Sequence, residues 1–333
     1  SGYATLPVAS LPAPEGRRRA VLTLAQEQVR RARRVMAARG FLETVTWSFT
    51  SQTDAQAFGG GAAELRVANP VASDLDQMRP SILPNLARAA QRAADRGERT
   101  VRLFEAGPIY LDDTPTGQHT VIAGLVRPHP QRHWRGPAGT YDAFAAKADL
   151  LAVLSALGHP PDRFQIGTTE DSHWHPGQAA TLKLGPKTVI ATFGALHPRT
   201  LRSLDVSGPA YCFELDLAKL PQPKAKAKAS KTKTRLDVAD QTPVHRDLAF
   251  LVDETVPAGE LLRLARTADK TLVTHVDVFD IYRGEGISDG QKSVALEVTL
   301  SPRGQALTDK DIDAVMAAVV KAIAKGTGAT LRG

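Results

Sequence analysis

A run of lysines separated by small residues divides the sequence into two unequal parts. From residue 221 to residue 235 the chain reads PQPKAKAKASKTKTR, without one large apolar side chain. Such a segment cannot bury enough surface to offset the entropy lost on ordering, so it predicts a linker over residues 219–243. The same basic run could instead lie along a phosphate backbone. In either case the chain must fold as separate units on each side of it.

Composition limits what these units can be. The 333 residues suffice for about two domains, and 42% of them are hydrophobic, which is enough for packed cores. The single cysteine, Cys212, allows no internal disulfide, which favours a reducing compartment and hence a cytoplasmic protein. No apolar run approaches the roughly 20 residues that span a bilayer, so we expect no membrane association.

The net charge of +7 is unevenly distributed along the chain. Residues 221–243 carry six Lys or Arg against two acidic residues, whereas residues 244–333 carry 11 against 13. Any contact between the last segment and a polyanion must therefore depend on a local patch rather than on overall charge.

The region upstream of the basic run mixes helices with strands. Thr23 and Gln26 form a capping-box pattern, and Gly40 ends the helix that follows. The polar face of that helix carries five arginines, which indicate a solvated or subunit-facing surface, or an RNA contact. Further helices are expected at 82–95 and 142–157, and strands at 45–49, 101–111, 119–127, 178–185, 187–195 and 210–217. Short connections between neighbouring strands favour an α+β domain around an antiparallel sheet.

Residues 244–333 show a cleaner alternation of elements. Strands are predicted at 244–252, 273–282, 292–300 and 329–332, and helices at 257–267 and 309–324. Thr308 is a plausible N-cap of the last helix, and Gly326 follows its end. The order βαββαβ is the ferredoxin-like arrangement, in which two helices cover one face of the sheet. The other face is left open for binding.

No catalytic constellation stands out from the sequence. It contains no P-loop, no HExxH and no GxSxG. The candidates that remain are His129 and His133, His173 and His175, and Glu105 with Asp112 or Asp113. The histidine spacing supplies no third metal ligand, and carboxylates at a strand end are more often solvated than paired for acid–base work. We therefore predict no catalytic residue and no metal ligand.

A series of motifs runs through the chain in order. They include GYATLP from residue 2, RGFLETVTWSF from 39, NPVASDLDQMRPSILP from 69, LFEAG from 103, HPGQA from 175, GALHP from 194, VFDIYRG from 278 and ATLR from 329. Together these motifs resemble the β subunit of bacterial phenylalanyl-tRNA synthetase over nearly the whole chain.

The resemblance implies an architecture that fits the division made above. Residues 20–218 look like the catalytic-like domain of that subunit, a class II synthetase-like antiparallel-sheet domain without activity. Residues 244–333 look like its ferredoxin-fold anticodon-binding domain. Residues 1–19 resemble the end of a preceding domain that is mostly missing, and the editing and N-terminal tRNA-binding domains would lie further upstream. The implied fold class is α+β throughout.

The resemblance also implies that the first domain forms no adenylate. An active class II site needs an arginine in its second motif to neutralise the α-phosphate, but FEAGPIYLDD from residue 104 offers carboxylates and a proline. The third motif should be rich in glycine and include an arginine, and FELDLAKL from residue 213 has neither. We therefore expect no cofactor on this chain. ATP and magnesium would be used by the catalytic α subunit.

The partners implied by the resemblance are the α subunit, in an α2β2 heterotetramer, and tRNA(Phe). The terminal domain would hold the anticodon through stacking, base-edge hydrogen bonds and phosphate contacts. The candidate contact residues are Arg246, Asp280, Tyr282, Arg283, Lys292 and Arg332. Tyr282 could stack on a base and Asp280 could accept from a base edge. The alternative for the charged residues is ordinary surface ion pairing.

Two interpretations from other classes compete with this one. The first is a free-standing RNA-binding protein that uses the ferredoxin-like sheet, although the aromatic signature of the common RNA-recognition module is missing. The second is an active enzyme that uses the histidines and carboxylates of the first domain. A pyrophosphate-exchange assay separates it from the supporting role.

Overall fold

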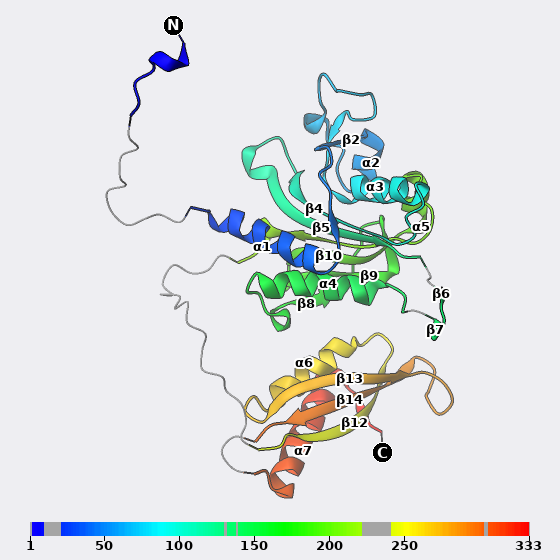
Figure 1. The fold of residues 1–333 in the computed structure, drawn as a ribbon. Coiled ribbons are helices and arrows are strands. Elements are labelled where there is room, and N and C mark those ends of the chain that lie inside the picture. The colour runs from blue at the N-terminus through cyan, green and yellow to red at the C-terminus, as the bar shows by residue number, and fades with distance from the viewer. Residues whose placement is uncertain are drawn as a thin grey trace. The chain divides into compact units, whose positions relative to one another are not determined.

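The computed structural model describes residues 2–9, 21–129, 132–137, 139–221, 241–302 and 306–332 (Figure 1). The chain forms two compact units, Ser1–Pro223 and Lys224–Gly333. The predicted basic linker falls mostly on residues 222–240, which lie outside the described residues, as do residues 10–20 of the predicted N-terminal remnant. Within that remnant, Tyr3–Thr5 form a short 3-10 helix, η1.

Among the described residues, a seven-stranded sheet forms the centre of the first unit. Its strands, in spatial order, are β1 (Leu42–Glu43), β4 (Val101–Tyr110), β5 (Gln118–Arg127), β11 (Tyr211–Asp216), β10 (Thr188–Leu196), β9 (Trp174–Leu184) and β8 (Gln165–Gly167). Neighbouring strands are antiparallel except β1 and β4, which are parallel. The predicted α+β fold around a mainly antiparallel sheet is confirmed.

Helices pack on both faces of this sheet (Figure 1). Side chains of β5 alternate between two cores, as the period of two along a strand requires. Val121 and Leu125 pack with α3, whereas Ile122 and Val126 pack with α1 and α4. The helix bounds are α1 (Leu24–Ala38), α2 (Gln52–Ala57), α3 (Leu83–Asp95), α4 (Ala143–Ala156) and α5 (Pro198–Ser203).

The smaller elements of the first unit connect these layers. They are β2 (Phe49–Thr50) paired with β3 (Gln77–Met78), β6 (Arg132–His133) paired with β7 (Gly136–Pro137), and the 3-10 helices η2 (Ala63–Leu65), η3 (Pro115–Gly117), η4 (Pro161–Arg163) and η5 (Leu217–Lys219).

Helix α1 begins where the sequence predicts. The Thr23 hydroxyl accepts from the Gln26 backbone N–H at 3.2 Å, and the Gln26 side chain accepts from the Thr23 N–H at 2.9 Å. This reciprocal pair satisfies two backbone donors that the first turn leaves free. Gly40 follows the end of the helix with a φ of +80°, a conformation that glycine adopts without strain.

Of the strand predicted at residues 45–49, only Phe49 lies in a strand, β2. Residues 44–47 form no strand, and Val45 and Trp47 are 85% and 62% exposed. Thr46 lies between them and turns inward, where its hydroxyl donates to Glu105 Oε2 at 2.6 Å. The apolar alternation is present in the sequence, but the inward-facing residue is Thr46, which bonds to the buried Arg79–Glu105 ion pair. The apolar side chains on either side of it point outward.

The second unit has the predicted ferredoxin-like topology. Its described residues form a four-stranded sheet in the order β13 (Val273–Tyr282), β14 (Gln291–Leu300), β12 (Val244–Asp253), β15 (Thr330–Leu331). Helices α6 (Ala258–Ala268) and α7 (Asp309–Thr327) cover one face. Val294, Leu296, Val298 and Leu300 of β14 all point into this core and are fully buried, as predicted.

Helix α7 is longer than predicted. Thr308 and Asp311 form the expected capping box at its start. Gly326, however, does not end it, because the helix continues to Thr327 and is closed by Gly328 at a φ of +70°. Gly326 has a packing role instead, since a Cβ at this position would lie 2.6 Å from Leu264 Cδ1 on α6.

Candidate functional site

The face of the second sheet that bears no helix, called here the open face, is defined by strand register. His275 and Asp277 of β13 lie opposite Thr299 and Glu297 of β14. Phe279 is then an extra residue in β13, because the register shifts between Val278 and Asp280. This bulge changes the alternation. Beyond it Asp280 and Tyr282 lie opposite Ala295 and Ser293, on the same open face.

Three of the predicted contact residues lie on the open face. The guanidinium carbon of Arg332 lies 5.9 Å from the centroid of the Tyr282 ring, within the range of a cation–π contact. The Arg332 backbone N–H donates to the Ala249 carbonyl at 2.8 Å, which fixes the chain end against β12. Asp280 is exposed on the same strand as Tyr282. The structure therefore places Asp280 on the same face as the Tyr282–Arg332 pair.

The floor between Tyr282 and Arg332 is made of small side chains. Ala249 of β12 lies opposite Ala295 of β14, and Ser293 lies opposite Tyr282. The resulting site offers a flat ring, a cation and a carboxylate around a shallow apolar floor.

The other three predicted residues lie elsewhere. Arg246 is opposite Val298 and so stands on the helix-bearing side of the sheet. Arg283 is paired with Glu254, with a shortest distance of 2.6 Å, at the strand ends. Lys292 is 7% exposed, and its ammonium donates to the Glu254 carbonyl at 2.8 Å. Arg283 and Lys292 both hold the turn that follows β12.

Sequence reasoning missed the charged residues at the other end of the open face. Asp247, Glu297 and Asp277 form one row across three strands, and His245 and His275 flank Thr299 in the next row. His275 Nε2 lies 2.6 Å from Asp277 Oδ2, and His245 Nδ1 lies 3.4 Å from Glu297 Oε1. The repeated His-x-Asp spacing in β12 and β13, the two strands that flank β14, was the available signal. This end of the face is acidic and disfavours phosphate.

A buried polar layer lies on the α3 side of the first sheet. Arg79 is 1% exposed, and its Nη2 lies 2.9 Å from Glu105 Oε1. Its remaining donors reach the Pro108 carbonyl and the Thr46 hydroxyl, both at 2.9 Å. Nearby, Glu214 lies in the same cross-sheet row as Glu105, with Ala123 between them. The Glu105 carboxylate is therefore bound by Arg79 and Thr46, and it forms no acid–base pair with Asp112 or Asp113.

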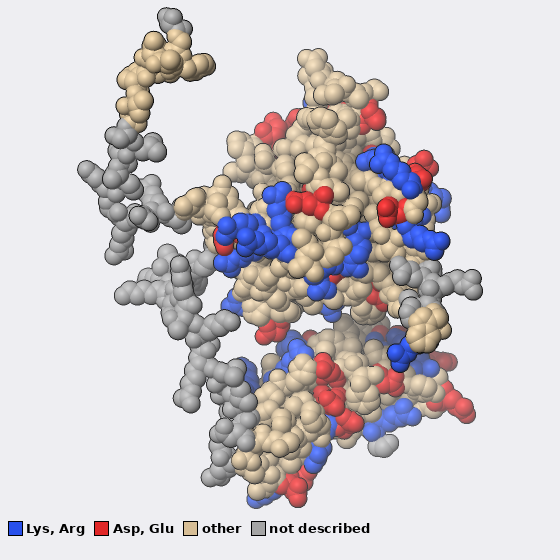
Figure 2. Space-filling view, in the orientation of Figure 1, with Lys and Arg blue, Asp and Glu red and all other residues tan. Residues whose placement is uncertain are grey.

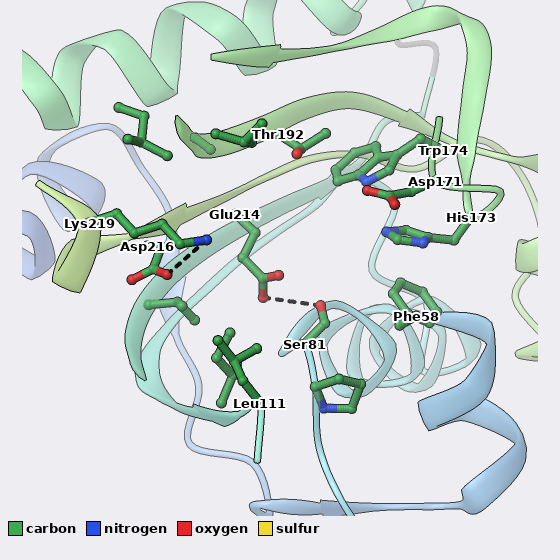
Figure 3. A pocket seen from close by; sticks show the side chains of 16 residues that line it. Phe58, Ser81, Leu111, Asp171, His173, Trp174, Thr192, Glu214, Asp216 and Lys219 are labelled. Carbon is green, nitrogen blue, oxygen red and sulfur yellow. Dashed lines mark hydrogen bonds and ion pairs between the residues drawn. The ribbon is translucent and has the colours of Figure 1, made fainter. Parts of the chain in front are cut away.

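A cavity of about 170 Å³ adjoins this layer (Figure 3). Ser81, Thr192 and Glu214 line its polar side, and Phe58, Leu111 and Trp174 belong to its apolar side. The Glu214 carboxylate accepts from the Ser81 hydroxyl at 3.1 Å and from the Ile82 backbone N–H at 2.8 Å. Burial nevertheless raises the pKa of Glu214 to about 7, because the ionised form loses water that these two donors do not replace.

Two of the histidines considered as metal ligands, His173 and His175, have local structural partners. His173 stacks against Phe58 with ring centroids 4.5 Å apart, and burial lowers its pKa to about 4. His175 Nδ1 accepts from the Gly177 N–H at 3.1 Å, within β9. The side chain of His133 lies outside the described residues. Within the part of the chain that the structure describes, no group of three or more His, Cys, Asp or Glu is arranged to hold a metal ion.

The arginines of α1 form a basic surface (Figure 2). Arg30 and Arg31 both pair with Glu27 at 3.0 Å, and Arg39, the C-cap residue that follows α1, pairs with the buried Asp149. These pairs compensate much of the charge on the helix face, which favours a solvated surface over a phosphate-binding one.

Comparison with known proteins shows what the chain is related to. The family model for the phenylalanyl-tRNA synthetase β chain CLM domain matches residues 9–217, and the model for the ferredoxin-fold anticodon-binding domain matches residues 240–332. The chain belongs to the phenylalanyl-tRNA synthetase β chain family. The family membership inferred from the sequence motifs is thus confirmed.

Members of the β chain family match almost the whole of this sequence. The phenylalanine–tRNA ligase β subunit of Bradyrhizobium diazoefficiens is 45% identical over 99% of this chain and 42% of its own length. That of Paramagnetospirillum magneticum is 47% identical over 100% of this chain and 41% of its own. The chain therefore spans about two fifths of the relatives it matches.

A solved pyrrolysyl-tRNA synthetase from Desulfitobacterium hafniense aligns at 15% identity, with a TM-score of 0.43 over 58% of this chain and 66% of that one. Among the helices in the described ranges, none is both long and apolar enough to cross a bilayer.

Proposed function

We propose that this chain is the C-terminal part of a phenylalanine–tRNA ligase β subunit, in which the second unit binds the anticodon of tRNA(Phe). The observation that carries the proposal is the placement of Tyr282, Arg332 and Asp280 on the open face of a domain that matches the anticodon-binding family.

The geometry of the open face suits an unpaired base. A base stacked on Tyr282 would lie over the small residues Ala249, Ser293 and Ala295. Stacking on an aromatic side chain contributes about 1–3 kcal/mol per base, and an arginine adds a cation for the base or its phosphate. Asp280 can accept from an amino group on the base edge. The acidic row at the other end disfavours phosphate there, which limits RNA to one part of the face.

Binding of a labelled tRNA(Phe) anticodon stem-loop, followed by fluorescence anisotropy at fixed salt, tests this site. Tyr282→Ala and Arg332→Ala should each weaken binding about tenfold, which corresponds to about 1.4 kcal/mol. Arg263→Ala is the matched control, because Arg263 is an exposed arginine on α6 that pairs with Glu260. If both open-face variants keep the parental affinity, the site assignment is wrong.

The first unit is proposed to support catalysis without forming adenylate. The arginine available in this layer, Arg79, is buried against Glu105, Pro108 and Thr46, so its guanidinium has no free donor side for a phosphate. ATP and magnesium would bind to the α subunit of the whole enzyme. Pyrophosphate exchange by this chain with ATP and phenylalanine should stay at background, and a clear exchange signal would refute the non-catalytic role.

The first unit is also proposed to pack against the α subunit within an α2β2 enzyme of the cytoplasm. Exposed apolar side chains support this interface, since Leu42, Val45 and Trp47 are 71%, 85% and 62% exposed close to the β1 edge. Trp47→Glu should abolish co-elution with purified α subunit. Ile166→Glu is the matched control, because Ile166 is a 51% exposed residue on β8 at the opposite edge of the sheet. Co-elution that survives Trp47→Glu would place the interface elsewhere.

A further inference from the structure

The cavity in the first unit has the composition of a small-molecule site. It combines apolar walls with a few polar groups that converge on one side, which is the usual character of ligand pockets. Phe58 and Trp174 form part of the apolar wall, and Glu214 lies in the middle of the lining residues with its carboxylate turned toward Ser81 (Figure 3). Nothing in the proposed role of this unit, which is packing against α, requires such a cavity.

One carboxylate oxygen of Glu214 remains available to a ligand. Oε1 accepts both described hydrogen bonds, from the Ser81 hydroxyl and the Ile82 N–H. Within the residues that the structure describes, Oε2 has no hydrogen-bond partner. Arg79 is the cation whose charge acts on Glu214, but its guanidinium is already paired with Glu105. The Glu214 carboxylate is therefore costly to ionise until another cation reaches it.

The charges around the cavity favour a cation over an anion. Asp171 and Asp216 line it together with Glu214. The cation among the lining residues is Lys219, whose ammonium lies 3.4 Å from Asp216 and is therefore already paired. His173 is neutral near pH 7, because burial lowers its pKa to about 4.

We propose that this cavity binds a small organic ammonium, a primary amine with an apolar body, whose ammonium group donates to Glu214 Oε2. The apolar body would occupy the space between Phe58, Trp174 and Leu111. A carboxylate or phosphate ligand would face Glu214 and Asp171, while the Lys219 ammonium is held by Asp216, so charge disfavours an anion. The inference is independent of tRNA binding and of the proposed contact with α.

A titration of the whole 333-residue chain with cyclohexylammonium chloride tests the proposal. The indole N–H signals of the three tryptophans are followed by NMR at pH 8 and constant ionic strength, and Trp174 is assigned with Trp174→Phe. Cyclohexanol and cyclohexanecarboxylate are the neutral and anionic probes of similar shape. We expect the Trp174 signal to shift with a millimolar Kd for the ammonium, at least tenfold weaker binding of the alcohol, and no shift with the carboxylate.

Two variants identify the carboxylate involved. Glu214→Gln should weaken cyclohexylammonium binding at least tenfold, whereas Glu64→Gln, at an exposed glutamate outside the cavity, should leave it unchanged. If Glu214→Gln does not fold, the comparison of ammonium with alcohol on the parental chain still decides. Equal responses to these two probes, no response of Trp174 to the ammonium, or undiminished binding by a folded Glu214→Gln chain would each overturn the proposal.

Discussion

The replacement of Glu214 by glutamine should stabilise the first unit, and more so as the pH rises. The amide side chain would keep an oxygen to accept from Ser81 and Ile82, so the two hydrogen bonds at 3.1 and 2.8 Å can persist. What the change removes is a negative charge beside the cavity. That charge is unfavourable in the folded chain mainly because burial strips it of water, and to a smaller extent because Asp216 carries the same sign.

The size of the effect follows from the two pKa values of the Glu214 carboxyl, which are 4.5 as the ordinary value and about 7 in the folded chain. Below pH 4.5 the group is protonated whether the chain is folded or not. Between pH 4.5 and about pH 7 the unfolded chain releases its proton first, so the free energy of unfolding falls as the pH rises. Above about pH 7 the loss is complete, at about 3 kcal/mol.

Urea unfolding of the parental chain and Glu214→Gln, at pH 5 and pH 8, measures this cost. Tryptophan fluorescence reports on the first unit alone, because Trp47, Trp134 and Trp174 all lie in it. The stability advantage of the glutamine variant should widen by about 2 kcal/mol between the two pH values.

Glu64→Gln, at an exposed position, serves as the control and should show no such widening. An advantage of Glu214→Gln that does not change with pH would refute the reasoning, since it would mean that the carboxyl ionises near its ordinary pKa.

Three other substitutions test separate parts of the structure. Arg79→Met should cost about 3–5 kcal/mol of unfolding free energy in the fluorescence assay, because it leaves Glu105 buried and unpaired; a loss below about 1 kcal/mol would contradict this. Gly326→Val should force α7 away from Leu264 and cost about 1–3 kcal/mol of unfolding free energy measured by far-UV circular dichroism, with the tryptophan transition unchanged; an unaltered dichroism transition would contradict the packing role. In the parental chain the free energy of unfolding should fall by up to about 3 kcal/mol as the pH drops from 6.5 through the folded His173 pKa of about 4. His173→Phe should remove this fall in urea unfolding followed by tryptophan fluorescence. A fall of the same size in the variant would mean that another group causes it.

Much of the fold could be predicted because local signals agree with the tertiary structure. Thr23 and Thr308 each sit three residues before a side chain that completes a capping box, so both helix starts are fixed by neighbouring residues. The alternation on β14 is equally local, because one face packs on two helices and the other does not. The family motifs then connected these elements to a known type of subunit.

The predictions that failed depend on distant partners. Val45 and Trp47 have the spacing of a buried strand. Thr46 between them points inward instead, because its hydroxyl is hydrogen-bonded to Arg79 and Glu105, which lie far along the chain. No pattern within a short window contains that information. Likewise Gly326 has the residue type of a helix stop, and only its contact with the preceding helix reveals a packing role.

The candidate contact residues divide for a similar reason. Residue type alone selects Arg283 and Lys292 as phosphate binders, but their charged groups hold the Glu254 turn. Which side of the sheet Arg246 occupies depends on register with β14. The missed His245 and His275 lie on either side of one strand, and are adjacent to it only once three strands are paired.

Phe279 is a bulge residue of β13 that has no partner in the β14 register. Its side chain is 59% exposed, and its neighbours Val278 and Asp280 already pair with consecutive residues of β14. A strand one residue shorter at this point could keep both pairs, whereas a strand that drew Phe279 into the ladder would turn Asp280 and Tyr282 toward the helices. Burial of the Asp280 carboxylate opposes that slip. Deletion of Phe279 should therefore leave the open face intact. Insertion or deletion of one residue between Asp280 and Tyr282 would instead disrupt that face.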